Sequence, residues 1–173
     1  MTTLYGTTFT LRPWCDADIP SLVKYANNRA ISRNLRNIFP HPYTREDAEA
    51  WVKLRKEDAQ EGLFFAIEVE GEAVGGIACQ VLDDVYAKGA MIGYWLGEPF
   101  WGRGIMSEAA SLVTDAAFDE LDIVRIEARV FEWNIGSARV LEKVGYHFEA
   151  RLERSVFRDG ELTDRLIYAM LRP

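Results

Sequence analysis

The sequence is poor in the residue types that build metal sites and disulfide frameworks. Its 173 residues include only two cysteines and two histidines. Cys15 and Cys79 have neither a CxxC spacing nor the density of a disulfide-rich protein, so we expect both thiols to be reduced. His41 and His147 are equally isolated. Because nothing here has the ligand spacing of a zinc site, we expect no catalytic transition metal.

Long apolar runs and a surplus of positive charge are also missing. No apolar run approaches the ~20 residues of a membrane span, and residues 1–8 lack the basic and apolar regions of a secretory signal. We therefore expect a cytoplasmic protein with no membrane partner. Lys and Arg total 20 against 27 for Asp and Glu, a net charge of -7. This balance disfavours nucleic-acid binding. It suits a cationic partner such as an amine, or simply solubility.

The patterns that are present predict a single α/β domain over residues 1–173, the size of one compact unit. Alternation and turn residues predict strands at 9–14, 63–69, 73–82, 90–96, 125–130, 147–157 and 165–171. Helical periodicity predicts helices at 19–26 behind an Asp16 cap, from Thr44 toward Gly62, at 105–121 and at 135–144. The strands at 90–96 and 125–130 are joined through a helix, so we expect them to be parallel.

The most informative segment is the glycine turn at 101–107, with the sequence WGRGIMS, between a predicted strand and a predicted helix. Small residues there let a polyphosphate approach the free N–H groups at the positive end of the helix dipole. The segment indicates a pyrophosphate site, although a tight turn without a ligand explains a GxG pattern as well.

Two familiar phosphate-binding motifs do not fit this turn. A P-loop needs a lysine and a hydroxyl after its second glycine, but Arg103 and Gly104 stand there. A dinucleotide fingerprint needs a third glycine, but Ser107 takes its place and no βαβ repeat precedes it. Both of these nucleotide-binding classes are therefore disfavoured.

A second segment, NIGS at 134–137 leading into RVLEKVGY at 139–146, completes the pattern. Together with the glycine turn, it resembles the GNAT superfamily of acyl-coenzyme A N-acyltransferases, in the RimJ/RimL-like branch that includes N-terminal acetylation of ribosomal proteins. The resemblance runs from FTLRP at 9–13 to the closing hairpin and is strongest over 92–146. It implies acetyl-coenzyme A as cosubstrate. It also implies a mixed, twisted central sheet with flanking helices and a splayed parallel strand pair.

The resemblance assigns cofactor-binding roles residue by residue. It implies that backbone N–H groups of the glycine turn hold the coenzyme A pyrophosphate, those of Arg103, Gly104, Ile105, Met106 and Ser107. Met106 departs from the family, which more often has Gly or Ala there. Free amides of Trp95 and Leu96 are expected to face the thioester carbonyl, and Asn134 to bond the pantetheine arm. Lys143, one helical turn from Arg139, either meets a phosphate or lies on a solvated helix face.

The same resemblance implies direct attack of a neutral amine on the thioester. The backbone amide of Trp95 or Leu96 is expected to stabilise the oxyanion. Many members protonate the leaving sulfur with a tyrosine where this chain has Leu141, which cannot donate. Ser137 matches the serine of the RimJ/RimL-like branch and is our candidate acid, although serine is also common in first turns of helices. Glu98, Glu127 or water takes the ammonium proton.

We therefore predict an N-acetyltransferase that moves an acetyl group to a primary amine, either a protein N-terminus or a small amine. The alternative is a noncatalytic acyl-coenzyme A sensor or interaction module, because the usual tyrosine is absent. Aromatic residues near the motifs form either core or pocket walls: Trp95, Trp101, Trp133 and Tyr146. A homodimer is compatible with the sequence, which does not fix the oligomeric state.

Overall fold

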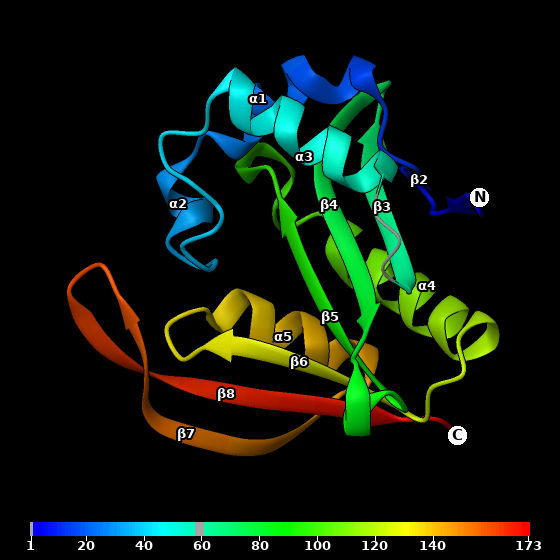
Figure 1. The fold of residues 1–173 in the computed structure, drawn as a ribbon, viewed down its shortest axis with the longest axis vertical. Helices are drawn as coiled ribbons and strands as arrows, with labels where there is room; N and C mark the ends of the chain where they lie inside the picture. The colour runs from blue at the N-terminus through cyan, green and yellow to red at the C-terminus, as the bar shows by residue number, and fades with distance from the viewer. Residues whose placement is uncertain (1, 58–60) are drawn as a thin grey trace.

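The computed structural model describes residues 2–57 and 61–173, which form one mixed sheet with helices on both faces (Figure 1). The described strands are β1 Leu4–Tyr5, β2 Thr10–Arg12, β3 Gly62–Val69, β4 Glu72–Val81, β5 Gly89–Leu96, β6 Arg125–Phe131, β7 His147–Arg158 and β8 Glu161–Leu171. Their order across the sheet is β1-β2-β3-β4-β5-β6-β8-β7. Neighbours are antiparallel except β5 and β6, which are parallel. The predicted mixed α/β class and the parallel pair are confirmed.

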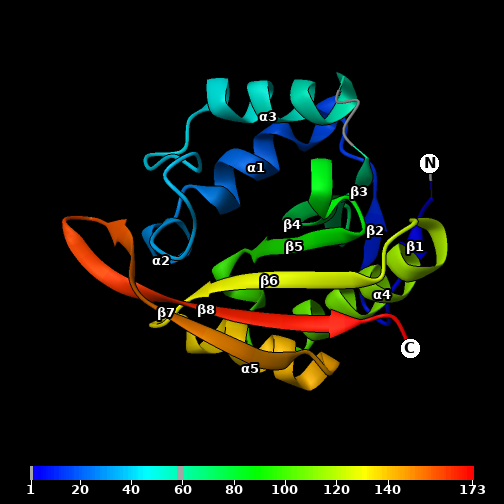
Figure 2. The same cartoon turned by 60° about the horizontal axis from the view of Figure 1, so that its bottom comes forward.

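The helices divide into two layers around this sheet (Figure 2). They are α1 Ile19–Ala26, α2 Arg29–Ser32, α3 Arg45–Glu57, α4 Ile105–Glu120 and α5 Ile135–Val144. One face is covered by α4 and α5, whose fully buried Val113 and Leu141 belong to the larger core. The other is covered by α1 and α3, which contribute Leu22 and Val52 to a second core. The sheet thus separates two cores, and β5 has side chains in both.

The parallel strands diverge where the sequence resemblance implied that they would. Pairing between β5 and β6 joins Gly89–Ile92 with Arg125–Ala128. Beyond these pairs, β5 continues to Leu96 and β6 to Phe131, and within the described part of the chain the register has no further β5–β6 pair. Backbone groups on the facing edges of the two strands are therefore left for other partners.

The start of α3 and the closing hairpin test two of the predicted element ends. The α3 helix begins as predicted, because Thr44 Oγ1 accepts from the Asp47 N–H at 3.3 Å while Asp47 accepts from the Thr44 N–H at 2.8 Å. Its expected continuation toward Gly62 crosses 58–60, which lie outside the described residues. The terminal hairpin is tighter than predicted, since only Asp159 and Gly160, both with positive φ, separate β7 from β8.

The expectation that Asp16 caps α1 is wrong, and Asp18 organises this segment instead. Asp16 is exposed and pairs with Lys56 at 2.8 Å. Asp18 is 2% exposed, and it accepts from the Cys15 N–H at 2.9 Å and from two Arg12 nitrogens at 2.9 and 2.7 Å. Burial raises the pKa of Asp18, but these hydrogen bonds, with that from Arg12 the strongest, lower the pKa overall. The ion pair fastens β2 to the start of α1.

Asp18→Asn is expected to lower the free energy of unfolding by about 2–3 kcal/mol at pH 7. This is less than the ~3–5 kcal/mol of a fully buried pair, because Arg12 keeps its contact with Glu68. Since the folded pKa of Asp18 lies below the unfolded 3.8, the wild type holds this stability above about pH 4 and loses it as the pH falls through the folded value. Urea unfolding of both proteins at pH 7 and pH 3 measures this difference. A gap that does not shrink at pH 3 would contradict the assignment.

Candidate active site

The pairing of β5 with β4 determines which backbone groups of β5 point toward the space where β5 and β6 diverge. Along an antiparallel strand, the direction of backbone hydrogen bonding alternates from residue to residue. The Gly97 N–H donates to the Val74 carbonyl at 2.7 Å, and the Leu82 N–H donates to the Gly89 carbonyl at 2.9 Å. Odd-numbered residues of β5 therefore direct their N–H and C=O groups toward β4, and even-numbered ones direct them toward β6.

This alternation directs the amides of the two expected oxyanion donors, Trp95 and Leu96, to opposite edges of β5. Trp95 lies opposite Gly76 of β4, so the register does not leave its amide free, contrary to the expectation from the sequence. Leu96 and Tyr94 direct their amides toward β6, beyond the last β5–β6 pair at Ile92. The carbonyl of Leu96 accepts from the Trp101 indole at 2.7 Å, which ties the glycine turn to the end of β5. The amide of Leu96 thus faces the divergence.

The glycine turn presents free amides at the start of α4. Gly102 and Gly104 have φ of +73° and +79°, a left-handed backbone that favours glycine. The first α-helical bond runs from the Glu108 N–H to the Gly104 carbonyl at 3.1 Å. The amides of residues 105–107 precede this bond, so they have no partner within the helix. An anion is favoured at such a group of amides.

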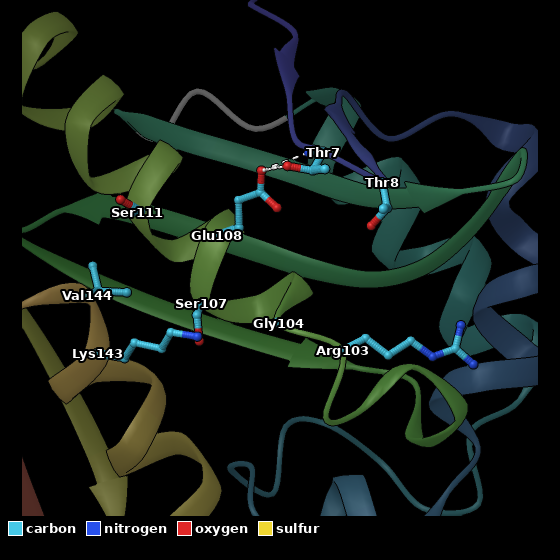
Figure 3. A pocket seen from close by; sticks show the side chains of 9 residues that line it. All are labelled: Thr7, Thr8, Arg103, Gly104, Ser107, Glu108, Ser111, Lys143 and Val144. Carbon is cyan, nitrogen blue, oxygen red and sulfur yellow. Dashed lines mark hydrogen bonds between the residues drawn. The ribbon is translucent and has the colours of Figure 1, made fainter.

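Side chains of this first turn leave those amides accessible. Ile105 and Met106 are 3% and 8% exposed and pack into the larger core. The departure of Met106 from the family pattern is thereby accommodated, because its side chain lies away from the solvent side of the turn. Glu108 Oε1 accepts from the Thr7 N–H and hydroxyl, both at 2.8 Å, and so points toward the loop after β1 (Figure 3).

An open cavity of about 550 Å³ lies in front of these amides. It is lined by Thr7, Thr8, Arg103, Gly104, Ser107, Glu108, Ser111, Lys143 and Val144. Lys143 extends from α5 toward the first turn of α4, whereas the Arg103 side chain extends away from it (Figure 3), with its guanidinium over the Phe100 ring at 5.2 Å. The structure thus brings Arg103, Gly104, Ser107 and Lys143 to one cavity, whereas Arg139 is exposed and does not line it. Free amides beside the Lys143 ammonium group fit a pyrophosphate.

The candidate acid lies on α5, on the α4 side of the sheet. Asn134 caps α5, with its Oδ1 accepting from the Ser137 N–H at 3.3 Å, and this leaves the side-chain NH2 group as a donor. Ser137 Oγ lies 3.0 Å from the hydroxyl of Tyr94. Leu141 is fully buried in the core, so no group at that position reaches a ligand. Ser137 therefore remains the candidate acid on this helix.

Comparison with known proteins tests the resemblance directly. A family model described as "Acetyltransferase (GNAT) domain" matches residues 8–147. The chain belongs to the GNAT acetyltransferase family. This confirms the family and the acyltransferase class expected from the two motifs.

Proteins similar to this GNAT protein, in sequence or in structure, are also named as acetyltransferases. It is 48% identical over 84 residues to the "Probable N-acetyltransferase YjcK" of Bacillus subtilis, a match that spans 49% of this chain and 46% of that protein. It is 29% identical to the "Uncharacterized N-acetyltransferase p20" of Bacillus licheniformis over 99% of this chain and 97% of that protein. The structure of Mycobacterium smegmatis RimJ in complex with CoA-disulfide aligns with a TM-score of 0.82 and 26% identity, covering 98% of this chain and 87% of that one.

The two candidate bases of the GNAT protein differ in their surroundings. Glu98, at the end of β5, is exposed, and its Oε2 accepts from Asn28 Nδ2 at 2.7 Å. Glu127 of β6 is paired with Arg125 at 3.3 Å and Arg129 at 2.8 Å. The carboxylate oxygens of Glu127 are therefore already engaged by two guanidinium groups. Glu98 is therefore the better placed of the two.

The aromatic residues near the motifs have separate roles. Tyr146 is 3% exposed, and its hydroxyl lies 2.8 Å from Thr114 Oγ1, so it belongs to the core. Trp95 packs edge-on against Phe39 at 5.7 Å between ring centroids, on the α1 side of the sheet. Trp133 donates its indole N–H to Asn34 at 3.1 Å. Phe39 and Asn34 both come from 27–44, the irregular segment between α1 and α3.

The hairpin of β7 and β8 contacts the irregular segment 27–44. The sequence did not reveal this contact. Arg158, at the end of β7, is 8% exposed and donates to the Ser32 carbonyl at 2.7 Å and to Asn37. Arg29 pairs with Asp159 at 2.5 Å beside it. A basic residue next to a turn ordinarily lies in solvent, so composition gives no signal for this burial.

Among residues 2–57 and 61–173, no group of three or more His, Cys, Asp or Glu side chains is arranged to hold a metal ion. The same residues include no helix long and apolar enough to cross a membrane.

Proposed function

We propose that this chain transfers the acetyl group of acetyl-coenzyme A to a primary amine by direct attack in a ternary complex. The observation that carries the proposal is the set of helix amides at 105–107, which have no partner within α4 and open onto a cavity that Lys143 also lines. An anion of two linked phosphates matches such a site in size and charge. We further propose that residues 1–173 act as one catalytic domain in the cytoplasm, without a nucleic-acid or membrane partner.

The residues of the diverging strands suit the rest of the cosubstrate. With the pyrophosphate on the amides of Arg103 to Ser107, the pantetheine arm reaches the space between β5 and β6, where the pairing has ended. The side-chain NH2 of Asn134 donates to the arm from the other side of this space. The Leu96 amide is directed at the thioester carbonyl. Holding both substrates in one cleft supplies much of the rate enhancement.

Three groups of the protein act during the transfer. As the amine nitrogen attacks and the carbonyl π electrons move to oxygen, the Leu96 amide stabilises the oxyanion, an effect typically worth ~10²–10³ in rate. Glu98 takes the ammonium proton, directly or through water. When the C–S bond breaks and its electron pair stays on sulfur, Ser137 gives that sulfur a proton. The products are an amide and a free thiol.

The acceptor belongs to the class of primary amines, and two kinds of relative support it. A RimL structure titled as the ribosomal L7/L12 alpha-N-protein acetyltransferase aligns with a TM-score of 0.83 at 23% identity, over 96% of this chain and 95% of that one. A "Spermidine N(1)-acetyltransferase" of Escherichia coli is 24% identical over 87% of this chain and 79% of that protein. Protein N-termini and small amines both carry positive charge before deprotonation, and the net charge of -7 attracts either.

Thiol release from acetyl-coenzyme A tests the proposal with a panel of acceptors. We expect turnover with at least one polyamine or one peptide bearing a free N-terminus, and none with the same peptide after N-terminal acetylation. The alternative, a noncatalytic sensor, is favoured by Leu141 at the usual tyrosine position. Thermal stabilisation by coenzyme A without turnover on any acceptor would support the sensor and contradict the enzyme.

A further inference from the structure

Tyr94 connects the strand that carries the oxyanion donor to the helix that carries the acid. Its neighbours Ile92 and Leu96, two residues away on either side along β5, are buried in the core under α4 and α5, and Tyr94 packs against the same core. Its hydroxyl lies 3.0 Å from Ser137 Oγ and 3.2 Å from the Ser137 carbonyl oxygen. Both contacts lie beyond Ile92, where β5 has stopped pairing with β6. The tyrosine thus spans the divergence on the α5 side.

One hydroxyl in contact with two oxygens of the same residue has two hydrogen-bonding states. A tyrosine hydroxyl donates one hydrogen and also accepts. In the first state, Tyr94 donates to the Ser137 carbonyl and accepts from the Ser137 hydroxyl, so the serine hydrogen is occupied. In the second state, Tyr94 donates to Ser137 Oγ, and the serine hydrogen is free for another acceptor. The direction of the Tyr94 hydroxyl therefore determines where the Ser137 proton points.

We propose that Tyr94 is the positioning residue of Ser137, supplying from β5 the tyrosine hydroxyl that α5 lacks because Leu141 stands at the usual place. This inference rests on the proposed function. As the C–S bond breaks, Ser137 gives its proton to sulfur, and Tyr94 donates to the negative charge left on Oγ. Ser137 then regains a proton from water. Glu98 or water has meanwhile taken one proton from the amine nitrogen, so protons balance over the reaction.

The surroundings of Tyr94 keep its hydroxyl protonated, so that it can donate a hydrogen bond. Burial raises the pKa of Tyr94 well above its usual 10, and the hydrogen bond with Ser137 lowers it by less. The hydroxyl therefore stays protonated across the working pH of the enzyme. Since Tyr94 acts only through Ser137, removing its hydroxyl should change turnover and leave cosubstrate binding intact.

Tyr94→Phe removes the hydroxyl and keeps the ring that packs in the core. We expect kcat to fall about tenfold, with the KM for acetyl-coenzyme A within about twofold of wild type, because only the leaving-group step loses a contact. Tyr146→Phe is the matched control, since it also removes a buried tyrosine hydroxyl bonded to another hydroxyl, that of Thr114, away from Ser137. Its kcat should match wild type. An unchanged kcat in Tyr94→Phe would overturn the inference.

A double variant tests whether Tyr94 acts through Ser137. Tyr94→Phe with Ser137→Ala should be no slower than Ser137→Ala alone, within about twofold, because the second removal has nothing left to act on. A further tenfold loss in the double variant would overturn the positioning role. If wild type releases no thiol with any acceptor, the proposed function fails and this inference with it. If wild type turns over and Tyr94→Phe equals it, this inference alone fails.

Fluorotyrosine at position 94 keeps both the hydroxyl and the fold, so it gives a result even if Tyr94→Phe does not fold. In 2,3,5,6-tetrafluorotyrosine, four ring fluorines lower the pKa of the hydroxyl strongly, which counteracts the increase that burial causes. We expect wild-type kcat near neutral pH and a loss of kcat at the alkaline pH where the hydroxyl ionises and no longer donates. Wild type should lack this alkaline limb over the same range. Identical pH profiles would contradict the requirement for a donating hydroxyl.

Discussion

Replacing Ser107 by aspartate is expected to weaken coenzyme A binding by about 100-fold, which corresponds to ~2.7 kcal/mol. Ser107 is the third residue of α4 and lines the cavity in front of the free amides. A carboxylate there repels the pyrophosphate that those amides attract. Two unit charges about 4 Å apart interact by ~4 kcal/mol in the partly screened environment near a protein surface. The expected loss is somewhat below that value because the cavity is open to water.

The same substitution should leave the fold at least as stable as before, which separates binding from folding. An acidic residue in the first turn of a helix is favoured by about 0.3–1 kcal/mol. Calorimetric titration with coenzyme A and thermal unfolding without it measure the two effects. Ser107→Asn, which changes size without adding charge, is the control and should bind within a few-fold of wild type. Undiminished binding by Ser107→Asp would place the pyrophosphate elsewhere.

Ser137→Ala is expected to lower kcat by about 100-fold, at the lower end of the ~10²–10⁴ that a positioned proton donor contributes. The lower end applies because a thiol of pKa near 8.5 leaves fairly well without help. Affinity for coenzyme A should stay within about twofold. The Asn134 cap uses the backbone N–H of Ser137, which alanine retains, so the start of α5 is preserved.

Steady-state kinetics with a saturating acceptor measure this effect. Ser155→Ala is a suitable control, since its exposed Oγ contacts only the Leu152 carbonyl, at 2.8 Å, among the hydrogen bonds found in the described residues. It should match wild type. An unchanged kcat in Ser137→Ala would remove Ser137 from the acid role. A large loss of coenzyme A affinity would instead make the residue part of the binding site.

Local features of the sequence predicted the elements of the site, because each depends on a few neighbouring residues. The glycine turn requires left-handed backbone at Gly102 and Gly104, and the periodicity after Ile105 requires a helix. The start of α5 at Asn134 and its end at Gly145 were visible for the same reason. These signals fixed where the free amides and the candidate acid lie along the chain.

Contacts between distant segments could not be predicted in this way. The register of β5 against β4, which directs the Trp95 amide toward Gly76 and the Leu96 amide toward β6, depends on the whole sheet. The contact between Tyr94 and Ser137 joins residues 43 positions apart on a strand and a helix. Because Tyr94 lies two residues from Ile92 and from Leu96 along β5, strand alternation predicts that the three side chains share one face of the sheet. It does not predict that Tyr94 contacts Ser137.

The packing of the irregular segment between α1 and α3 was equally hidden. Arg158 reaches back from the hairpin to Ser32, across 126 positions of sequence. Its contacts and the Trp95–Phe39 packing hold the segment between α1 and α3 against the rest of the molecule. The residues of this segment do not reveal that packing, because the groups that order it lie in the hairpin and in β5.

A crystal structure with bound coenzyme A shows directly where the cosubstrate lies. We expect pyrophosphate oxygens within hydrogen-bonding distance of the amides of residues 105–107, the pantetheine arm between β5 and β6, and the thiol beside Ser137. A pyrophosphate bound elsewhere while those amides meet only water, or a thiol lying outside the two diverging strands, would contradict this expectation.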